Sequence, residues 1–259
     1  MYNRTFKRIL ATAGIVMMAV SAAACGNKST SGEVKSTGAD EQVTTTAQET
    51  ASSSEAAAQE AAAGVSKAAA QPISTVSSKG YSIEVIDGIT YVDGILIANK
   101  TYALPSSYAP GDITPEVKSA FAVMQQAAAS QGLNLYISSG FRSYERQSTL
   151  YNRYVNADGK ALADTYSARA GHSEHQTGLC FDLNTIDDSF ANTPESAWLE
   201  QHAQEYGFII RYGKGKENVT GYQYEPWHLR YLGVDLATKV YNTGLSLEEY
   251  LGITSEYQN

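Results

Sequence analysis

The sequence predicts an α+β fold: a single compact domain with a small, mostly antiparallel sheet flanked by helices, preceded by a disordered tether. Helix and strand patterns mix without the regular alternation that a parallel sheet requires. The pairs Asp87-Gly88 and Asp93-Gly94 are strong hairpin signals. Aromatic residues are missing between Phe6 and Tyr81, and 17 of the 18 tyrosines lie at or after Tyr81. We therefore expect the folded domain to cover residues 80–259.

The composition excludes several functional classes. A formal net charge of −8, from 19 Lys and Arg against 27 Asp and Glu, argues against a nucleic-acid binder, which would carry a basic face. The two cysteines, Cys25 and Cys180, are too few for a disulfide-stapled fold or a four-cysteine zinc module. No sequence feature indicates an obligate protein partner.

Residues 1–25 resemble an export signal of the bacterial lipoprotein type. A basic start precedes an apolar run from Ile9 to Val20, which is too short to span a bilayer as a stable helix. Small residues follow, and then Cys25, which cleavage would leave as a lipid-modified N-terminus. Ala22 stands where Leu is usual, so ordinary secretory cleavage stays open, as does an uncleaved anchor helix. The segment predicts an exported, extracytoplasmic bacterial protein that is attached to the cell membrane through its N-terminal lipid.

Residues 26–79 predict a disordered linker. Ala, Ser, Thr and Gly account for 33 of its 54 residues (12, 10, 7 and 4). Such a segment cannot bury enough apolar area to offset the entropy lost on ordering. We expect a flexible tether between the membrane and the domain.

The first half of the domain predicts short strands and then a helix. Alternation and turn signals indicate strands between Tyr81 and Ile97. Thr114 is a good N-cap, with Pro115 at the first helical position and an acid in the first turn. Apolar residues then fall on one helical face: Val117, Ala120, Phe121, Met124 and Ala128.

Further elements follow in order along the chain. We expect a strand over Leu133–Ser138, a helix from Tyr144 to about Asn156, a strand over Leu179–Leu183, a helix from Pro194 that stops at Gly207, a strand over Phe208–Arg211, and a short final helix capped by Ser246.

Two stretches combine histidines with carboxylates. A catalytic zinc takes three protein ligands and leaves one position for water, and a nearby carboxylate usually accepts the proton of that water. His175, Asp182 and His228 can supply two imidazoles and one carboxylate. Strand alternation places Asp182 opposite its apolar neighbours, and Glu225 can supply the base.

Pro226 excludes a helical arrangement of Glu225 and His228, because a proline inside a helix removes a hydrogen bond and forces its neighbour toward extended geometry. We expect an extended segment with a bend that brings Glu225 and His228 to one side.

Three stretches together resemble the zinc D-alanyl-D-alanine carboxypeptidases related to the vancomycin-resistance carboxypeptidase VanY. That family carries a Ser-x-His-x-x-Gly-x-x-x-Asp motif, matched by residues 173–182, and a later Glu-x-x-His, matched by residues 225–228. The Gly-Phe-Arg-Ser at residues 140–143 is similar to the family's arginine motif. The resemblance covers roughly residues 89–233. Cys180 departs from it, because Ala is common at that position.

The resemblance implies one Zn²⁺ per chain, with His175, Asp182 and His228 as ligands and Glu225 as the catalytic base. It implies that Arg142 contacts the substrate and the developing oxyanion, and that Ser173 and Gln147 help to hold the terminal D-residue. The implied substrate is a peptidoglycan stem peptide ending in D-Ala-D-Ala, from which D-alanine is released. An arginine fork suits the free carboxylate that an exopeptidase must recognise.

The motifs are also compatible with other activities. The same fold could act as an L,D-carboxypeptidase on tetrapeptides or as a D,D-dipeptidase. A catalytically silent wall-binding lipoprotein could keep zinc for structure, although such a protein usually loses the base or the arginine. We interpret His172 and His202 as structural and Cys180 as a buried thiol.

Overall fold

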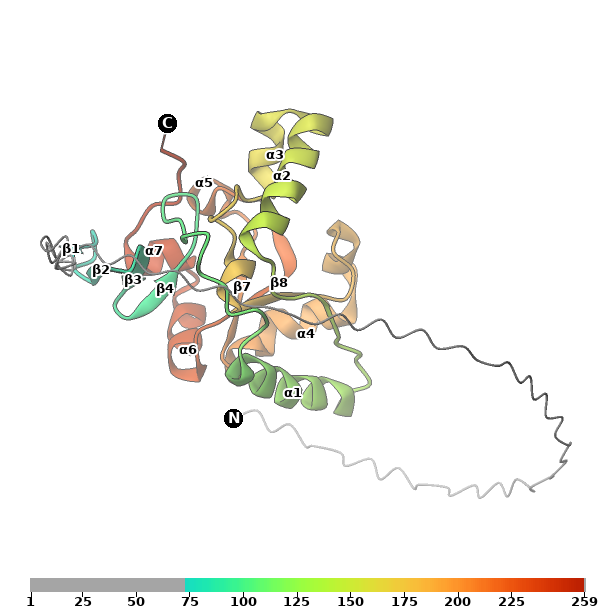
Figure 1. Cartoon of the computed structure of the whole chain (residues 1–259). Helices are drawn as coiled ribbons and strands as arrows, with labels where there is room; N and C mark the ends of the chain where they lie inside the picture. The colour runs from blue at the N-terminus through green and yellow to red at the C-terminus, as the bar shows by residue number, and fades with distance from the viewer. Residues whose placement is uncertain (1–72, 259) are drawn as a thin grey trace, which may run out of the picture. The chain divides into compact units, whose positions relative to one another are not determined.

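The computed structural model describes residues 73–258 (Figure 1). The expected signal segment with Cys25 and most of the expected linker lie outside the described residues. None of the helices within residues 73–258 is long and apolar enough to cross a membrane. The described part is a single domain that combines helices with two small antiparallel sheets, which confirms the predicted α+β class.

The first sheet is a meander of four short strands in sequence order. They are β1 (Ile73–Val76), β2 (Ser82–Ile86), β3 (Ile89–Val92) and β4 (Ile95–Ile97). At the β2–β3 turn Asp87 and Gly88 have φ values of 51° and 78°. Positive φ at both central residues is the requirement of a tight hairpin turn, which is why Asp-Gly favours one. The predicted strands and turns in this region are confirmed.

The folded region begins earlier than the expected boundary at residue 80. Strand β1 pairs antiparallel with β2, with Val76 opposite Ser82, and therefore lies inside the stretch assigned to the linker. Here the alanine-rich composition gives way to β-branched residues, including Thr75 and Val76, which favour strands. The boundary at residue 79 is therefore wrong, because these last residues pair with the sheet.

The second sheet positions the functional residues. It consists of β5 (Ile137–Ser139), β6 (Cys180–Leu183), β7 (Phe208–Tyr212) and β8 (Glu225–Tyr231), in the spatial order β5-β6-β8-β7 with antiparallel neighbours. The strand expected over Leu133–Ser138 is shorter than predicted, because only its last part pairs with β6.

Strand β8 contains Pro226 although it lies between two partners. Ile210 of β7 is opposite Leu229, whereas Tyr212 is opposite Glu225, so β8 has extra residues between these pairs. Its pairing with β6 covers only the later part of the strand, beginning at His228. Proline in a sheet is tolerated at such bulges because it has no N–H to donate. The predicted bend is confirmed as this bulge.

Four helices begin where the sequence predicts them, and three further short helices, which start at Lys160, Glu217 and Val234, were not predicted. They are α1 (Pro115–Ser130), α2 (Tyr144–Asp158), α3 (Lys160–Tyr166), α4 (Pro194–His202), α5 (Glu217–Thr220), α6 (Val234–Thr243) and α7 (Leu247–Leu251). The helix expected to run to Gly207 is α-helical only to His202 and continues as a 3₁₀ turn, Ala203–Tyr206, before Gly207. The predicted capping box of Ser246 and Glu249 is present.

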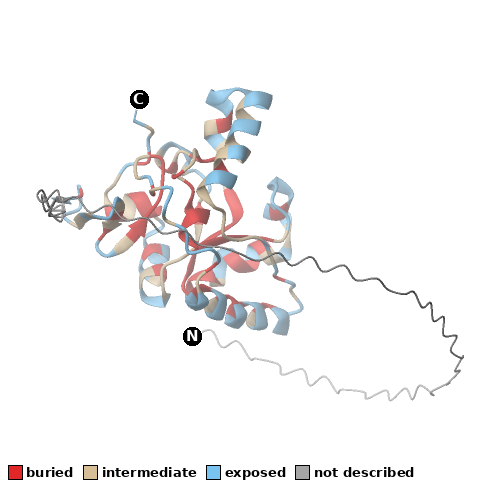
Figure 2. Ribbon diagram, in the orientation of Figure 1, coloured by how far each residue is buried: buried red, intermediate tan, exposed pale blue. Residues whose placement is uncertain are grey.

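The core lies between the second sheet and helices α1 and α4 (Figures 1 and 2). Phe121 of α1 packs edge-on against Phe181 of β6, with ring centroids 5.0 Å apart. The predicted apolar face of α1 is buried at Val117, Phe121, Met124 and Ala128. A second buried cluster joins the two sheets to α6 and α7. The faces of β6 and β8 opposite α1 remain available for polar residues.

Four charged side chains are buried together beside this second cluster. Arg211 of β7 donates to Glu174 Oε1 at 2.7 Å and to Glu248 Oε2 at 2.8 Å. Arg230 of β8 also donates to Glu174 Oε1, at 2.9 Å. Each of the four residues is at most 1% exposed. Burial alone would raise the pKa of Glu174, but the two guanidinium groups outweigh it and hold that pKa well below its usual range.

We predict that Arg211→Ala lowers the free energy of unfolding by about 3–5 kcal/mol, because removing one partner leaves buried carboxylates uncompensated. Urea denaturation measures this change. The control is Lys118→Ala, which breaks the exposed Lys118–Asp112 pair and should cost no more than about 1 kcal/mol. Equal losses in the two variants would contradict the structural importance of the buried cluster.

Candidate functional site

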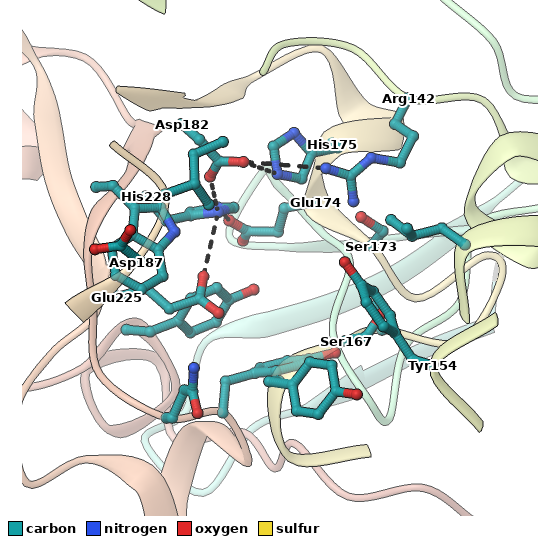
Figure 3. A pocket seen from close by; sticks show the side chains of 18 of the residues that line it. Arg142, Tyr154, Ser167, Ser173, Glu174, His175, Asp182, Asp187, Glu225 and His228 are labelled. Atoms are coloured by element: carbon teal, nitrogen blue, oxygen red, sulfur yellow. Dashed lines mark ion pairs between the residues drawn. The ribbon is translucent and has the colours of Figure 1, made fainter. Parts of the chain in front are cut away.

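A cavity of about 520 Å³ is lined by Asp182 of β6 and by Glu225 and His228 of β8. Figure 3 shows these side chains directed toward one another. One wall carries His175, Asp182, Glu225 and His228, and Arg142 and Ser173 also line it. Helices α2 and α3 contribute the tyrosines Tyr154 and Tyr166, and the loop after β6 contributes Asp187 and Asp188. The structure thus brings three distant stretches of the chain to one cavity.

His175 lies on a 3₁₀ turn, Glu174–Thr177, that leads into β6. Its Nδ1 is 2.7 Å from the carbonyl oxygen of Gly140. A carbonyl can only accept, so this contact places the proton on Nδ1 and leaves Nε2 with a lone pair when the ring is neutral. That Nε2 is directed at Asp182 Oδ2, 3.2 Å away.

Asp182 and His228 are directly opposite each other on β6 and β8. His228 Nδ1 lies 3.0 Å from Asp182 Oδ1, yet this buried oxygen has no hydrogen-bond partner among the described residues. The other ring nitrogen, Nε2, lies 3.4 Å from Glu174 Oε2. The side-chain pairing that strand register imposes therefore accounts for the closeness of these two groups.

Glu225 reaches the same point because of the bulge in β8. In a regular strand, residues three apart point to opposite faces, but Glu225 Oε2 lies 3.7 Å from His228 Nδ1. Burial raises the pKa of Glu225 to about 7, and the Asp182 carboxylate adds to this effect. A carboxyl with a pKa near neutrality can both accept and return a proton.

Arg142 borders the cavity beside this group. Its Nη2 lies 4.0 Å from Asp182 Oδ2 and donates to Ser139 Oγ at 3.1 Å. Its Nη1 donates to Gln147 Oε1 at 2.8 Å. The guanidinium is therefore fixed on its inner side while Arg142 still lines the cavity.

Ser173 lines the cavity, as its expected role in binding requires, but Gln147 does not. Gln147 is 1% exposed and lies behind Arg142, where its amide nitrogen donates to the carbonyl oxygen of Ala168 at 2.5 Å. The expectation that Gln147 helps to hold the terminal D-residue stays a prediction, and in this structure any such help would act through Arg142. Because its oxygen accepts from Arg142, the residue positions the arginine.

The donor atoms around Asp182 fit a metal ion. Both imidazoles face the Asp182 carboxylate, His175 through Nε2 and His228 through Nδ1. The Oδ1 atom of that carboxylate has no hydrogen-bond partner among the described residues. Facing lone pairs of this kind are satisfied when they share one cation. A second set overlaps with it: donor atoms of His175, Cys180 and His228 all lie within 4.8 Å of one another. Asp182 lines the cavity whereas Cys180 does not, so the set with Asp182 is the one that leaves room for water.

The charges in this cluster depend strongly on each other. Burial would lower the pKa of His175, but the adjacent Asp182 carboxylate outweighs burial and raises it to about 9. Burial would likewise raise the pKa of Asp182, but the two imidazoles hold it well below its usual range. Without a cation, protons supply the positive charge that these buried groups attract.

Glu174 is the residue that sequence reasoning missed. It stands between two motif residues, Ser173 and His175, but its partners Arg211 and Arg230 are 37 and 56 residues away in the chain. No local pattern indicates such a pairing. His172 and His202 lie outside the cavity lining, and each has a partner elsewhere: the Asn99 carbonyl oxygen at 2.8 Å and Glu205 at 3.0 Å.

Comparison with known proteins agrees with this geometry. The profile of the VanY family, described as D-alanyl-D-alanine carboxypeptidase, matches residues 111–234. The Bacillus subtilis protein YodJ is 36% identical over 196 residues, which cover 65% of this chain and 72% of YodJ.

Two solved structures are also similar. The LD-carboxypeptidase LdcB shares 42% identity with a TM-score of 0.59, covering 73% of this chain and all of that one. A mutant of the vancomycin-resistance D,D-pentapeptidase VanY, solved in complex with Zn(II), shares 34% identity with a TM-score of 0.53, covering 60% of this chain and 97% of that one.

Gly178, which ends the turn that carries His175, provides a test of this local geometry. It has φ of +70°, and a Cβ there would lie 2.6 Å from the carbonyl oxygen of Asp112. We predict that Gly178→Ala lowers the free energy of unfolding by about 2–5 kcal/mol, the sum of left-handed strain and overlap with backbone. Thermal denaturation measures the loss.

Gly244→Ala is the matched control for this prediction. Gly244 has φ of +65° but open space around its missing Cβ, so only the conformational cost of about 1–2 kcal/mol is expected. If both variants lose the same stability, the contact between Gly178 and Asp112 has no energetic role.

Proposed function

Because the chain belongs to the VanY family of D-alanyl-D-alanine carboxypeptidases, we propose that it is a zinc-dependent carboxypeptidase of peptidoglycan stem peptides, from which it releases the C-terminal D-alanine. The observation that supports this most is the convergence of His175, Asp182, His228 and Glu225 on one wall of an open cavity. Two imidazoles and a carboxylate are a common ligand set for catalytic zinc.

In this proposal His175 Nε2, Asp182 and His228 Nδ1 hold the zinc ion. When bound there, zinc would polarise the scissile carbonyl. It would also lower the pKa of a water molecule, so that this water can lose a proton and attack the carbonyl. Zinc is preferred over other divalent ions on the basis of the donor types, and the VanY structure in complex with Zn(II) supports that choice.

Glu225 is the proposed catalytic base. Its carboxylate lies next to His228 Nδ1, on the wall that would face the attacking water. Glu225 accepts the proton of that water and returns it to the nitrogen of the departing D-alanine. Its buried position removes competing water from the carboxylate, which strengthens its interaction with the reacting atoms.

Arg142 is the proposed partner of the substrate's negative charge. A C-terminal exopeptidase has to recognise a free carboxylate, and the planar guanidinium matches it. The same group can stabilise the oxyanion that develops at the attacked carbonyl. Ser139 and Gln147 fix its orientation in advance, and Ser173 offers a hydroxyl on the cavity wall.

Two peptide bonds are candidates for cleavage. The sequence motifs favour the D-Ala-D-Ala bond, which agrees with the VanY relatives. The LD-carboxypeptidase LdcB, however, is more similar in identity and in coverage, which favours the bond between an L-residue and D-alanine in tetrapeptides. We therefore propose the L,D bond as the first candidate and the D,D bond as the second. The presence of both Glu225 and Arg142 disfavours a silent wall-binding protein.

The proposed location follows from the N-terminal sequence alone. We propose that residues 1–25 direct export and that a lipid on Cys25 holds the protein outside the bacterial membrane, with the linker as a tether. Mass spectrometry of the mature N-terminus tests this, because a cleaved chain without a lipid on Cys25 would contradict it.

We predict that Glu225→Gln retains one zinc per chain but releases D-alanine about a hundred- to ten-thousandfold more slowly, because the amide cannot accept the proton. Metal analysis and a D-alanine assay measure the two properties. Glu217→Gln, at an exposed helix position, is the control and should leave both unchanged. Full turnover in the Glu225 variant would mean that another group is the base.

The choice between the two bonds is tested with defined stem peptides. We expect the tetrapeptide to be converted to tripeptide fastest, the pentapeptide to lose one D-alanine more slowly, and chelation by EDTA to stop both reactions. Mass spectrometry of the products distinguishes these cases. Faster release from the pentapeptide would establish the D,D bond, and rapid hydrolysis of free D-Ala-D-Ala would indicate a dipeptidase.

A further inference from the structure

The thiol of Cys180 lies next to both site histidines, although the catalytic proposal gives it no role. Cys180 is fully buried in β6 and shares a strand face with Asp182, two residues further on. Its sulfur and one ring nitrogen from each of His175 and His228 lie within 4.8 Å of one another. The buried Nε2 of His228 has no hydrogen-bond partner among the described residues.

We propose that Cys180, His175 and His228 form a buried binding site for a thiophilic metal cation such as Cd²⁺, separate from the set that contains Asp182. Thiolate and imidazole ligands together select soft and borderline ions. Around a tetrahedral zinc ion, with metal–sulfur and metal–nitrogen distances near 2.3 and 2.05 Å, a sulfur and a nitrogen ligand are about 3.6 Å apart, and the larger Cd²⁺ allows a wider spacing. Side-chain shifts of about 1 Å would therefore close the trio around one ion.

The two ligand sets differ in their access to water. Asp182 lines the cavity, so an ion held with it has an open position toward the substrate. Cys180 is absent from the cavity lining and has no exposed surface, so its sulfur would approach a shared ion from the buried side of the two histidines.

The two sets share His175 and His228, so they cannot both be filled. A thiophilic ion bound by Cys180 therefore excludes the ion that Asp182 would hold. Provided that the proposed peptidase activity is correct, Cd²⁺ or a similar ion acts as an inhibitor by occupying the histidines from the buried side.

The test is titration of the metal-free full-length protein with Co²⁺ and with Cd²⁺, followed by absorption spectroscopy. Thiolate coordination produces a charge-transfer band in the ultraviolet that imidazole and carboxylate ligands do not produce. We expect the wild-type chain to show this band with one ion per chain. Asp182→Asn should retain the band, because the amide variant leaves the thiolate set intact.

Cys180→Ala is expected to lose the band and to bind Cd²⁺ about tenfold or more weakly, since even groups that only support a metal ligand contribute tenfold or more to affinity. Cys25 is still present in the Cys180→Ala variant, so a band that came from Cys25 would persist in it. Cys180→Ser, which preserves the size of the buried side chain, gives a second measurement if the alanine variant unfolds.

Three outcomes would overturn the proposal: a wild-type protein that binds no Cd²⁺, one that binds it without the band, or a band that persists in both Cys180 variants. The spectroscopic result does not depend on peptidase activity. A failure of the proposed function would appear in the D-alanine assay with zinc, and a failure of the thiolate site would appear in the absorption spectrum.

Discussion

The buried charge cluster of Glu174, Arg211, Arg230 and Glu248 is the constraint on which the position of the site depends. Charges removed from water must be paired closely, because an unpaired one costs several kcal/mol. Glu174 precedes His175 in the same 3₁₀ turn, and its two arginine partners come from β7 and β8. The pairing therefore fixes that turn against the sheet. Since His228 lies on β8, the same interactions set the distance between the two imidazoles, whose ring centroids are 5.0 Å apart.

The cluster also connects the site to the C-terminal helix α7 and to the segment that follows β4. Glu248 belongs to the C-terminal helix α7 and accepts from the side-chain amide of Asn99, just after β4, at 3.1 Å. The segment after α7 then runs alongside residues 99–101, where Asn99 donates to the carbonyl oxygen of Thr254 at 3.0 Å. Elements outside the three sequence motifs thus have a physical role at the site, because they complete the pairing of charges that the turn carrying His175 introduces.

Much of the candidate site was predictable from local rules. Alternation along β6 placed Asp182 away from the core, and the restriction that Pro226 imposes on its neighbours required an extended, bent segment that brings Glu225 and His228 together. What could not be predicted depends on partners distant in sequence. Gln147 has the composition of a surface helix residue, and only its contacts with Arg142 and Ala168 show that it is buried. Strand β1 was missed because its neighbours in sequence are polar and small, while the pairing that orders it comes from β2.

The same rule that makes Asp182 available to a metal also determines what lies beneath the histidines. In a pleated strand, residues i and i+2 point to the same face, so any side chain at position 180 faces the imidazoles that Asp182 contacts. A methyl group at this position would present no donor atom, whereas a thiol presents a polarisable one that binds soft cations. The residue at position 180 therefore decides whether His175 and His228 can share an ion only with Asp182 or also with a thiolate. This choice is independent of the cavity wall, because Cys180 has no surface there.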